Sequence, residues 1–194
     1  MKFAARMALA ASVLSTSTFA IAEENAHLGA YAKGAYVGTF LSTNMIESDS
    51  AGFSLEAEPT SMGVRAGYYL IPQIAIEARY STSISDDTAE VNNIGTGVDV
   101  SLPYNYGAYI KAGYPAKKFE PYLLLGWNKF EFEAEAPGVS NKVSDSGLSL
   151  GLGVSLFVND ALGFNLEALS VYDKDGSGYE ESITQGSLGV VYSF

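Results

Sequence analysis

Five charged residues stand inside otherwise apolar stretches of the sequence, where a charge needs a partner. Each alternates along the chain with apolar neighbours, so on an extended strand the charged and apolar side chains would point to opposite faces. Charges that are kept from water must form ion pairs or stay hydrated. We therefore predict an interior ion network, which would be either a gate in a small pore or a structural filling. Its candidate members are Arg65, Glu77, Arg79, Lys111 and Glu167.

Arg65 and Glu77 are the clearest candidate pair within this network. They flank residues 71–73, a short segment with Pro72 at its centre that is typical of a tight turn. On two consecutive antiparallel strands, residues of equal parity are direct or diagonal neighbours on one face. The sequence therefore predicts an ion pair between Arg65 and Glu77.

Catalytic chemistry has little support in the sequence. His27 is the single histidine, and no His-x-Ser pair supplies the base and nucleophile of a serine hydrolase or acyl transferase. The chain contains no cysteine, which excludes disulfides and thiolate metal sites. We expect a protein that is not an enzyme, with no catalytic residues, no cofactor and no metal site.

The elements that would position the charged residues are β-strands, because apolar residues recur at every second position. Short turns at residues 71–73, 115–118 and 159–160 alternate with longer polar loops at residues 43–60, 85–100, 134–144 and 173–182. The pattern predicts eight strands, at about residues 28–42, 61–70, 74–84, 101–114, 120–133, 146–158, 162–172 and 183–194.

Two kinds of barrel fit eight such strands. A soluble lipocalin-like barrel would hide its apolar face and expose charge, whereas here the polar faces carry mostly Gly and Ser with isolated charges. Each strand is long enough for a tilted membrane crossing, which takes about 9 to 11 residues. The sequence thus predicts an all-β fold, an eight-stranded transmembrane antiparallel up-and-down β-barrel. An eight-stranded barrel is only wide enough to be filled by side chains, which favours the structural network over the gate.

The last predicted strand ends the sequence on an aromatic residue. Its apolar face carries Leu188, Val190, Tyr192 and Phe194. An exposed strand edge of this kind invites aggregation, and pairing with the first strand would remove that edge. We expect these four side chains to face lipid and to form a signal for assembly.

Charge and the N-terminal residues indicate an exported protein. The formal net charge is -11, which makes nucleic acid an unsuitable partner. Lys2 and Arg6 precede an apolar run, residues 7–20, and Ala20-Ile21-Ala22 fits the small-x-small pattern of signal-peptide cleavage. The sequence predicts a cleaved signal peptide over residues 1–22 and a barrel domain over residues 23–194.

Several short motifs resemble the small bacterial outer-membrane β-barrels of the OmpA transmembrane domain, OmpX and Ail type. They are Gly-x-x-x-Gly-Tyr at residues 63–68, Ile-Glu-Ala-Arg-Tyr at residues 76–80, Pro-Tyr-Leu at residues 121–123, and the ending at residues 188–194. More loosely, the chain resembles accessory colonisation factors of the AcfA type. We expect it to differ from OmpA by ending at the barrel, without a peptidoglycan-binding domain.

The resemblance implies a monomer in the bacterial outer membrane, inserted by the barrel insertion machinery, which would read the ending. Its partners would be outer-membrane lipid and lipopolysaccharide, which the acidic loops could meet through divalent cations. The expected role is envelope integrity or surface contact, including adhesion. A small passive pore is the alternative. An enzyme that modifies lipid A is a third possibility, which the missing His-Ser pair disfavours.

Overall fold

The structure is a computed structural model that describes residues 34–50, 53–91, 94–116, 118–136, 139–176 and 179–194. The predicted signal peptide and His27 lie outside the described residues. Within those ranges, no helix has the length and apolar character needed to cross a membrane. The elements are β1 (Gly34–Ser50), β2 (Phe53–Ala57), β3 (Thr60–Ile71), β4 (Ile74–Ser85), β5 (Asp87–Val91), β6 (Ile94–Gly113), β7 (Phe119–Ala136), β8 (Val139–Phe157), β9 (Leu162–Gly176) and β10 (Tyr179–Ser193).

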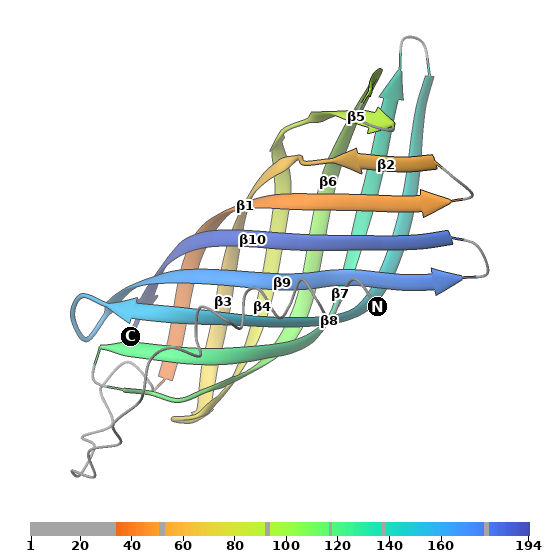
Figure 1. Ribbon diagram of the computed structural model, residues 1–194. Helices are drawn as coiled ribbons and strands as arrows, with labels where there is room; N and C mark the ends of the chain where they lie inside the picture. Colours follow the sequence, from red (N-terminus) through yellow and green to blue (C-terminus); the bar gives the residue numbers. More distant parts are fainter. Residues whose placement is uncertain (1–33, 51–52, 92–93, 117, 137–138, 177–178) are drawn as a thin grey trace.

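Eight of these strands close into an antiparallel barrel (Figure 1). The order around the wall is β1–β3–β4–β6–β7–β8–β9–β10, and β10 pairs with β1 from Tyr36↔Ser193 to Ser50↔Tyr179. The short strands β2 and β5 continue β3 and β4 beyond interruptions at Glu58–Pro59 and Asp86, and they pair with β1 and β6. The predicted eight-stranded barrel is confirmed.

The strands are longer than the sequence predicts. Most of the segments expected to be polar loops are strand, so that β6 begins at Ile94 and β7 continues to Ala136. In these segments acidic residues stand among both polar and apolar residues, so the regular apolar–polar alternation is weak. A sequence pattern of this kind is typical of a loop. The barrel therefore has a turn end with short connections and an extended end that includes β2 and β5 (Figure 1).

The wall of the barrel is apolar on the outside. The exposed large apolar side chains include Val37, Leu41, Met62, Val64, Tyr80, Ile110, Leu125, Trp127, Leu150, Leu166 and Leu188. In water this surface would be strongly unfavourable, whereas in a bilayer it meets hydrocarbon. The polarity is opposite to that of a lipocalin-like barrel.

Strand pairing settles which side chains face inward at two places in the wall. In β7, Leu123 and Leu125 point outward, while Leu124 is fully buried inside the barrel. In β6, simple alternation predicts that Leu102 shares the outward face of Tyr106, but Leu102 is buried. The β6–β7 register shifts between Ser101 and Tyr104, next to Pro103, and this irregularity turns Leu102 inward.

Candidate functional site

Glu167 on β9 is the centre of the interior ion network. Its carboxylate accepts from Arg65 Nη1 at 2.5 Å and from Arg79 Nη1 at 2.7 Å, and the side chains of Arg65 and Glu167 are each 1% exposed. The hydroxyl groups of Tyr122 and Ser187 also donate to this carboxylate. One buried carboxylate thus joins residues from β3, β4, β7 and β10, which fixes the barrel cross-section at this level.

Glu77 on β4 extends the same network. It pairs with Arg79 Nε and accepts a hydrogen bond from the Tyr36 hydroxyl at 2.5 Å. The expected Arg65–Glu77 pair is not formed, and this part of the prediction is wrong. The β3–β4 register places Arg65 opposite Arg79 and Gly67 opposite Glu77. Arg65 therefore pairs with Glu167, and Arg79 contacts both Glu77 and Glu167.

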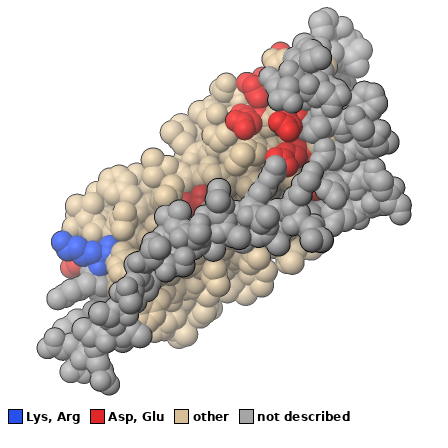
Figure 2. Space-filling model, in the orientation of Figure 1, with Lys and Arg blue, Asp and Glu red and all other residues tan. Residues whose placement is uncertain are grey.

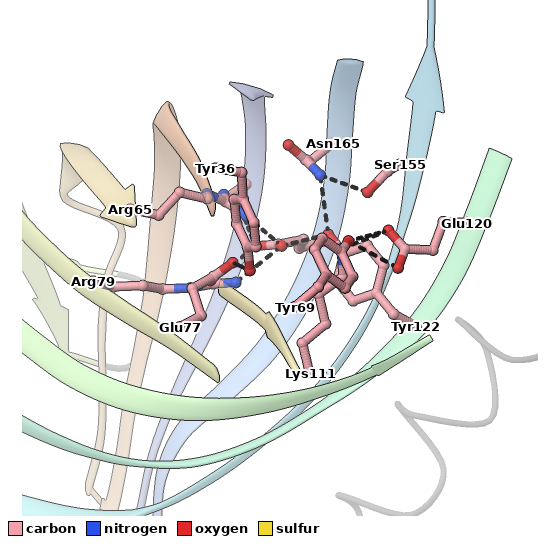
Figure 3. Close-up of polar contacts among 12 residues, drawn as sticks. Tyr36, Arg65, Tyr69, Glu77, Arg79, Lys111, Glu120, Tyr122, Ser155 and Asn165 are labelled. Carbon is pink, nitrogen blue, oxygen red and sulfur yellow. Dashed lines mark hydrogen bonds and ion pairs between the residues drawn. The ribbon is translucent and has the colours of Figure 1, made fainter. Parts of the chain in front are cut away.

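A second ion pair lies closer to the turn end (Figure 3). Lys111 Nζ is 2.6 Å from Glu120 Oε2 and 2.8 Å from the Tyr69 hydroxyl oxygen. The ammonium group also lies over the ring of Tyr122, at 4.2 Å from its centroid, and over the rings of Tyr36 and Tyr69. Glu120 and the aromatic rings together compensate a cation that has lost its water.

Glu120 is the member of the network that sequence reasoning missed. The five predicted residues carry three positive charges and two negative charges, and all five are buried inside the barrel. Glu120 supplies the third negative charge, so the six buried charges sum to zero. That imbalance was the available signal, because an enclosed interior disfavours an uncompensated cation.

Glycines on the inner face make room for the aromatic side chains of the network. A Cβ at Gly67 would lie 2.3 Å from Cζ of Tyr36, and one at Gly153 would lie 2.7 Å from the Tyr122 hydroxyl oxygen. These glycines are the cross-strand partners of Tyr36 and Tyr122. The Gly-rich faces in the sequence are therefore the positions over which inward tyrosines lie.

The interior is apolar on either side of the charges. Toward the turn end, Tyr36, Tyr69, Ala75, Phe157 and Val191 pack together. Toward the extended end, a larger cluster begins at Leu124 and Leu169. It continues through Ile46, Ala57, Ala89, Val100, Leu102, Phe130, Val171 and Ile183. The charged layer thus lies between two apolar layers of the barrel interior.

The comparisons with known proteins agree with this architecture. The family model described as the outer membrane protein beta-barrel domain matches residues 7–194, nearly the whole chain. The chain belongs to this family. It is an outer-membrane β-barrel, and its location is the bacterial outer membrane. A comparison with curated protein sequences gives no significant match.

Solved structures of other outer-membrane barrels share the fold. OprG of Pseudomonas aeruginosa has a TM-score of 0.62 and 14% identity over 84% of this chain and 96% of that chain. Neisserial surface protein A has a TM-score of 0.60 and 18% identity over 84% and 98%. Ail of Yersinia pestis has a TM-score of 0.55 and 13% identity over 84% and 99%.

The extended end of this outer-membrane barrel is acidic on the outside. Figure 2 shows acidic side chains gathered near β2 and β5, and basic side chains at the opposite end. The exposed acidic residues are Glu56, Glu58, Asp86, Asp99, Glu135 and Glu181. Among the described residues there, Lys142 lies in contact with Glu133 at 2.8 Å and with Glu131 at 3.7 Å.

The terminal strand of this barrel presents its alternate residues outward at the closure seam. Leu188, Val190, Tyr192 and Phe194 are all exposed on the apolar outer surface. The Phe194 amide donates to the Ala35 carbonyl at 3.0 Å, and Leu188 lies directly opposite Leu41 of β1. The last residue is thus held at the junction that closes the barrel.

Proposed function

We propose that this chain is a monomeric outer-membrane barrel with a filled polar lumen, which acts through its extended end in envelope integrity or surface contact. The observation that carries the proposal is the set of six buried, mutually compensating charges, whose side chains meet across the interior. A permanent passage would need water along these groups. Instead, each carboxylate accepts from side chains on other strands of the wall.

The acidic extended end supplies the contact surface in this proposal. In membrane barrels the short turns face the periplasm and the longer outer segments face outward. On this proposal Glu56, Glu58 and Asp86 therefore lie at the cell surface. They would meet lipopolysaccharide phosphates through Mg²⁺ or Ca²⁺. Among the described residues, no group of three or more carboxylate or imidazole side chains is placed to hold a metal ion. Such a cation would therefore take part of its ligands from the lipid.

Two similar structures belong to surface proteins, which supports a role in surface contact. One is Neisserial surface protein A, and the other is the attachment invasion locus protein of Yersinia pestis. The latter was also solved in complex with the heparin analogue sucrose octasulfate. With a net charge of -11 and an acidic end, this chain is poorly suited to a polyanion of that kind.

The proposal is tested by two measurements on the same protein. Cells with and without the protein are compared for adhesion and for detergent sensitivity, and we expect both properties to differ. The purified barrel is added to a planar lipid bilayer, where we expect no stepwise conductance. Steady single-channel steps, together with unchanged adhesion and detergent sensitivity, would support the passive pore instead.

A further inference from the structure

Four buried side-chain atoms inside the barrel have no hydrogen-bond partner among the described residues. They are Nε and Nη2 of Arg65, Oδ1 of Asn105 and Oδ1 of Asn165. Buried polar atoms are normally satisfied, either by other protein groups or by ordered water. The two donors of Arg65 and the acceptor of Asn165 lie on neighbouring parts of the inner wall, and together they define a candidate binding site.

Arg65 uses only one of its three nitrogen atoms within the ion network. Its Nη1 donates to Glu167 at 2.5 Å, whereas Arg79 donates to carboxylates through Nε, Nη1 and Nη2. Nε and Nη2 of Arg65 lie along one edge of the planar guanidinium group, so their N–H bonds point in nearly the same direction. The ring of Phe40 supplies a cation–π contact at 4.9 Å but no hydrogen-bond acceptor. This free edge of Arg65 is buried and needs a further acceptor.

Two glycines of the inner face make room for the Arg65 side chain at the closure seam. Gly38 of β1 is the cross-strand partner of Arg65, and a Cβ at Gly38 would lie 3.2 Å from Cγ of Arg65. A Cβ at Gly189 of β10 would lie 3.3 Å from Nη2 of Arg65. The guanidinium group thus extends from β3 over β1 to a position on β10 that carries no side chain.

Asn165 approaches the same glycine from the other side. It lies on β9 directly opposite Gly189, and the Cβ positions of such a pair are about 4.5 to 5.5 Å apart. Its Nδ2 donates to the hydroxyl oxygens of Ser155 at 2.8 Å and Tyr122 at 3.5 Å. The Tyr122 hydroxyl donates its own hydrogen to Glu167, so the amide turns its NH2 group to Tyr122 and its oxygen away. Figure 3 shows the Asn165 oxygen on the side away from Ser155.

The polarity of these atoms selects the occupant of the site. Arg65 offers only donors and Asn165 Oδ1 only an acceptor, so the bound group must both accept and donate hydrogen bonds. An inorganic cation would be repelled by Arg65. An anion would have no hydrogen for Asn165, and it would add charge to a network whose six charges already sum to zero. Water accepts and donates hydrogen bonds within the space of a small side chain.

We propose that the barrel binds one long-lived water molecule over Gly189, which accepts from the free edge of Arg65 and donates to Asn165 Oδ1. The water would link β3 to β9 across β1 and β10, the two strands that close the barrel. Glycine at position 189 leaves the space that the water needs. This inference rests on the proposed function, because only a filled lumen encloses a water molecule in this way.

The test compares the two arginines of the barrel in one experiment. Residues 23–194 contain only Arg65 and Arg79, so arginine labelled with nitrogen-15 gives two Nε–H signals for the barrel in detergent micelles. A bound water gives cross-peaks of opposite sign in water-selective NOE and ROE spectra, whereas hydrogen exchange gives the same sign in both. We expect the bound-water pattern at Arg65 and no water contact at Arg79, whose Nε donates to Glu77.

Two asparagine substitutions identify the second partner of the water. Asn165→Ala removes the proposed acceptor, and we expect the water cross-peak at Arg65 to be lost. Asn105→Ala removes the other unpaired amide oxygen, whose strand neighbours are Ser81 and Phe130, and it serves as the matched control. In this control the cross-peak at Arg65 should be unchanged.

Nitrate distinguishes an anion site from a water site in the wild-type barrel. Its planar oxygen atoms match the paired N–H groups of an arginine edge. We expect no saturable shift of the Arg65 Nε–H signal on titration with nitrate, because a further negative charge there would be uncompensated. The measurement needs no substitution, so it does not depend on how well the asparagine variants fold.

Three results would overturn the proposal. They are no bound-water cross-peak at Arg65 in the wild-type barrel, an unchanged cross-peak in Asn165→Ala, and a saturable nitrate shift. If the first result came with no conductance in planar bilayers, the filled lumen would stand and only the water site would be removed. If both arginines showed contacts with freely diffusing water and the barrel gave steady single-channel steps, the proposed function would fail together with the site.

Discussion

Along β7, the outward side chains change from Leu123, Leu125 and Trp127 to Glu131, Glu133 and Glu135, while the inward residue Phe130 stays apolar. The same alternate residues of β7 point outward along the whole strand. The change in their character therefore reflects a change in what surrounds the barrel. Next to lipid, the outside is apolar and the inside carries compensated charges. At the extended end, the outside is acidic and the inside is an apolar cluster, as in a water-soluble barrel. Lys129 marks the boundary.

This difference indicates that ion pairs at the two levels of the barrel contribute unequally to its stability. Near the middle of the barrel, ion pairs are enclosed, and the loss of one member leaves its partner without water. At the extended end, Lys142 and Glu133 form a pair that water reaches, where such pairs contribute little. Substitutions of similar chemistry should therefore have unequal effects in the two regions.

The largest effect is expected from Glu167→Gln. This change removes the carboxylate that both Arg65 and Arg79 contact, and we expect a loss of about 3 to 5 kcal/mol in the free energy of unfolding. Urea-induced unfolding in lipid vesicles measures the loss. Glu135→Gln, at an exposed position of the extended end, is the matched control and should leave the midpoint unchanged. Equal urea midpoints for Glu167→Gln and Glu135→Gln would contradict the expected difference between the two regions.

The next expectation is that the free energies of unfolding are coupled within the enclosed ion pair and not within the exposed ion pair. Lys111→Met and Glu120→Gln should each destabilise the barrel by about 3 kcal/mol, and the double variant should lose less than the sum, because neither charge is left alone. The same cycle with Lys142→Met and Glu133→Gln should show no resolvable coupling. Simple additivity at Lys111 and Glu120 would mean that the two residues do not form a pair.

The exposed pair also has a defined pH dependence. The hydrogen bond that Lys142 donates to the Glu133 carboxylate raises the pKa of Lys142 in the folded protein. Its contribution is therefore complete below the pKa of the unfolded chain and is lost as the pH rises through the higher folded-state value. An NMR titration of the Lys142 side chain should show later deprotonation in the folded protein than in the urea-unfolded chain.

A smaller effect is expected from placing one charge at two outward positions of β7. Leu125→Lys puts an ammonium group against lipid and should cost about 2 to 4 kcal/mol, depending on its depth. Glu135→Lys makes the same side chain at the extended end, where we expect no resolvable change. Unfolding midpoints in vesicles measure both. If Glu135→Lys destabilised as strongly as Leu125→Lys, the extended end would also lie in lipid.

The smallest change in stability is expected from deletion of Phe194. The residue is 75% exposed at the closure seam, so its removal should leave folding into detergent micelles close to normal. We propose that the ending Leu188–Phe194 acts as an assembly signal, and the yield of folded barrel in the outer membrane should then fall strongly. Equal yields in micelles and in cells would show that Phe194 is an ordinary rim residue.

Period-two alternation predicted most of the barrel because one face of each strand must meet lipid. The method failed where that constraint ends. Residues 43–48, 134–135 and 141–144 belong to strands, yet their outward residues face water and the sequence pattern there is typical of a loop. Simple alternation predicts the wrong face for Leu102, because the register shift beside Pro103 cannot be seen in the alternation pattern.

For the candidate site, the sequence indicates which charged residues face inward, but it does not indicate which of them contact each other. Burial of Arg65, Glu77, Arg79, Lys111 and Glu167 follows from parity alone. Their pairing depends on register and on contacts across the barrel, such as Arg65 with Glu167, and no local pattern encodes such contacts. Glu120 was overlooked because it stands at the start of a strand, where charge is ordinary.

The central claim is that the outward face of one strand passes from lipid to water at Lys129. The chain has no native cysteine, so single cysteines can be placed along β7 and tested on intact cells with a membrane-impermeant maleimide. We predict rapid labelling at the outward positions 131, 133 and 135, and protection at 123, 125 and 127. Inward positions 124 and 130 should be protected in both regions. Uniform labelling of the outward positions, or protection at 133 and 135, would contradict the account.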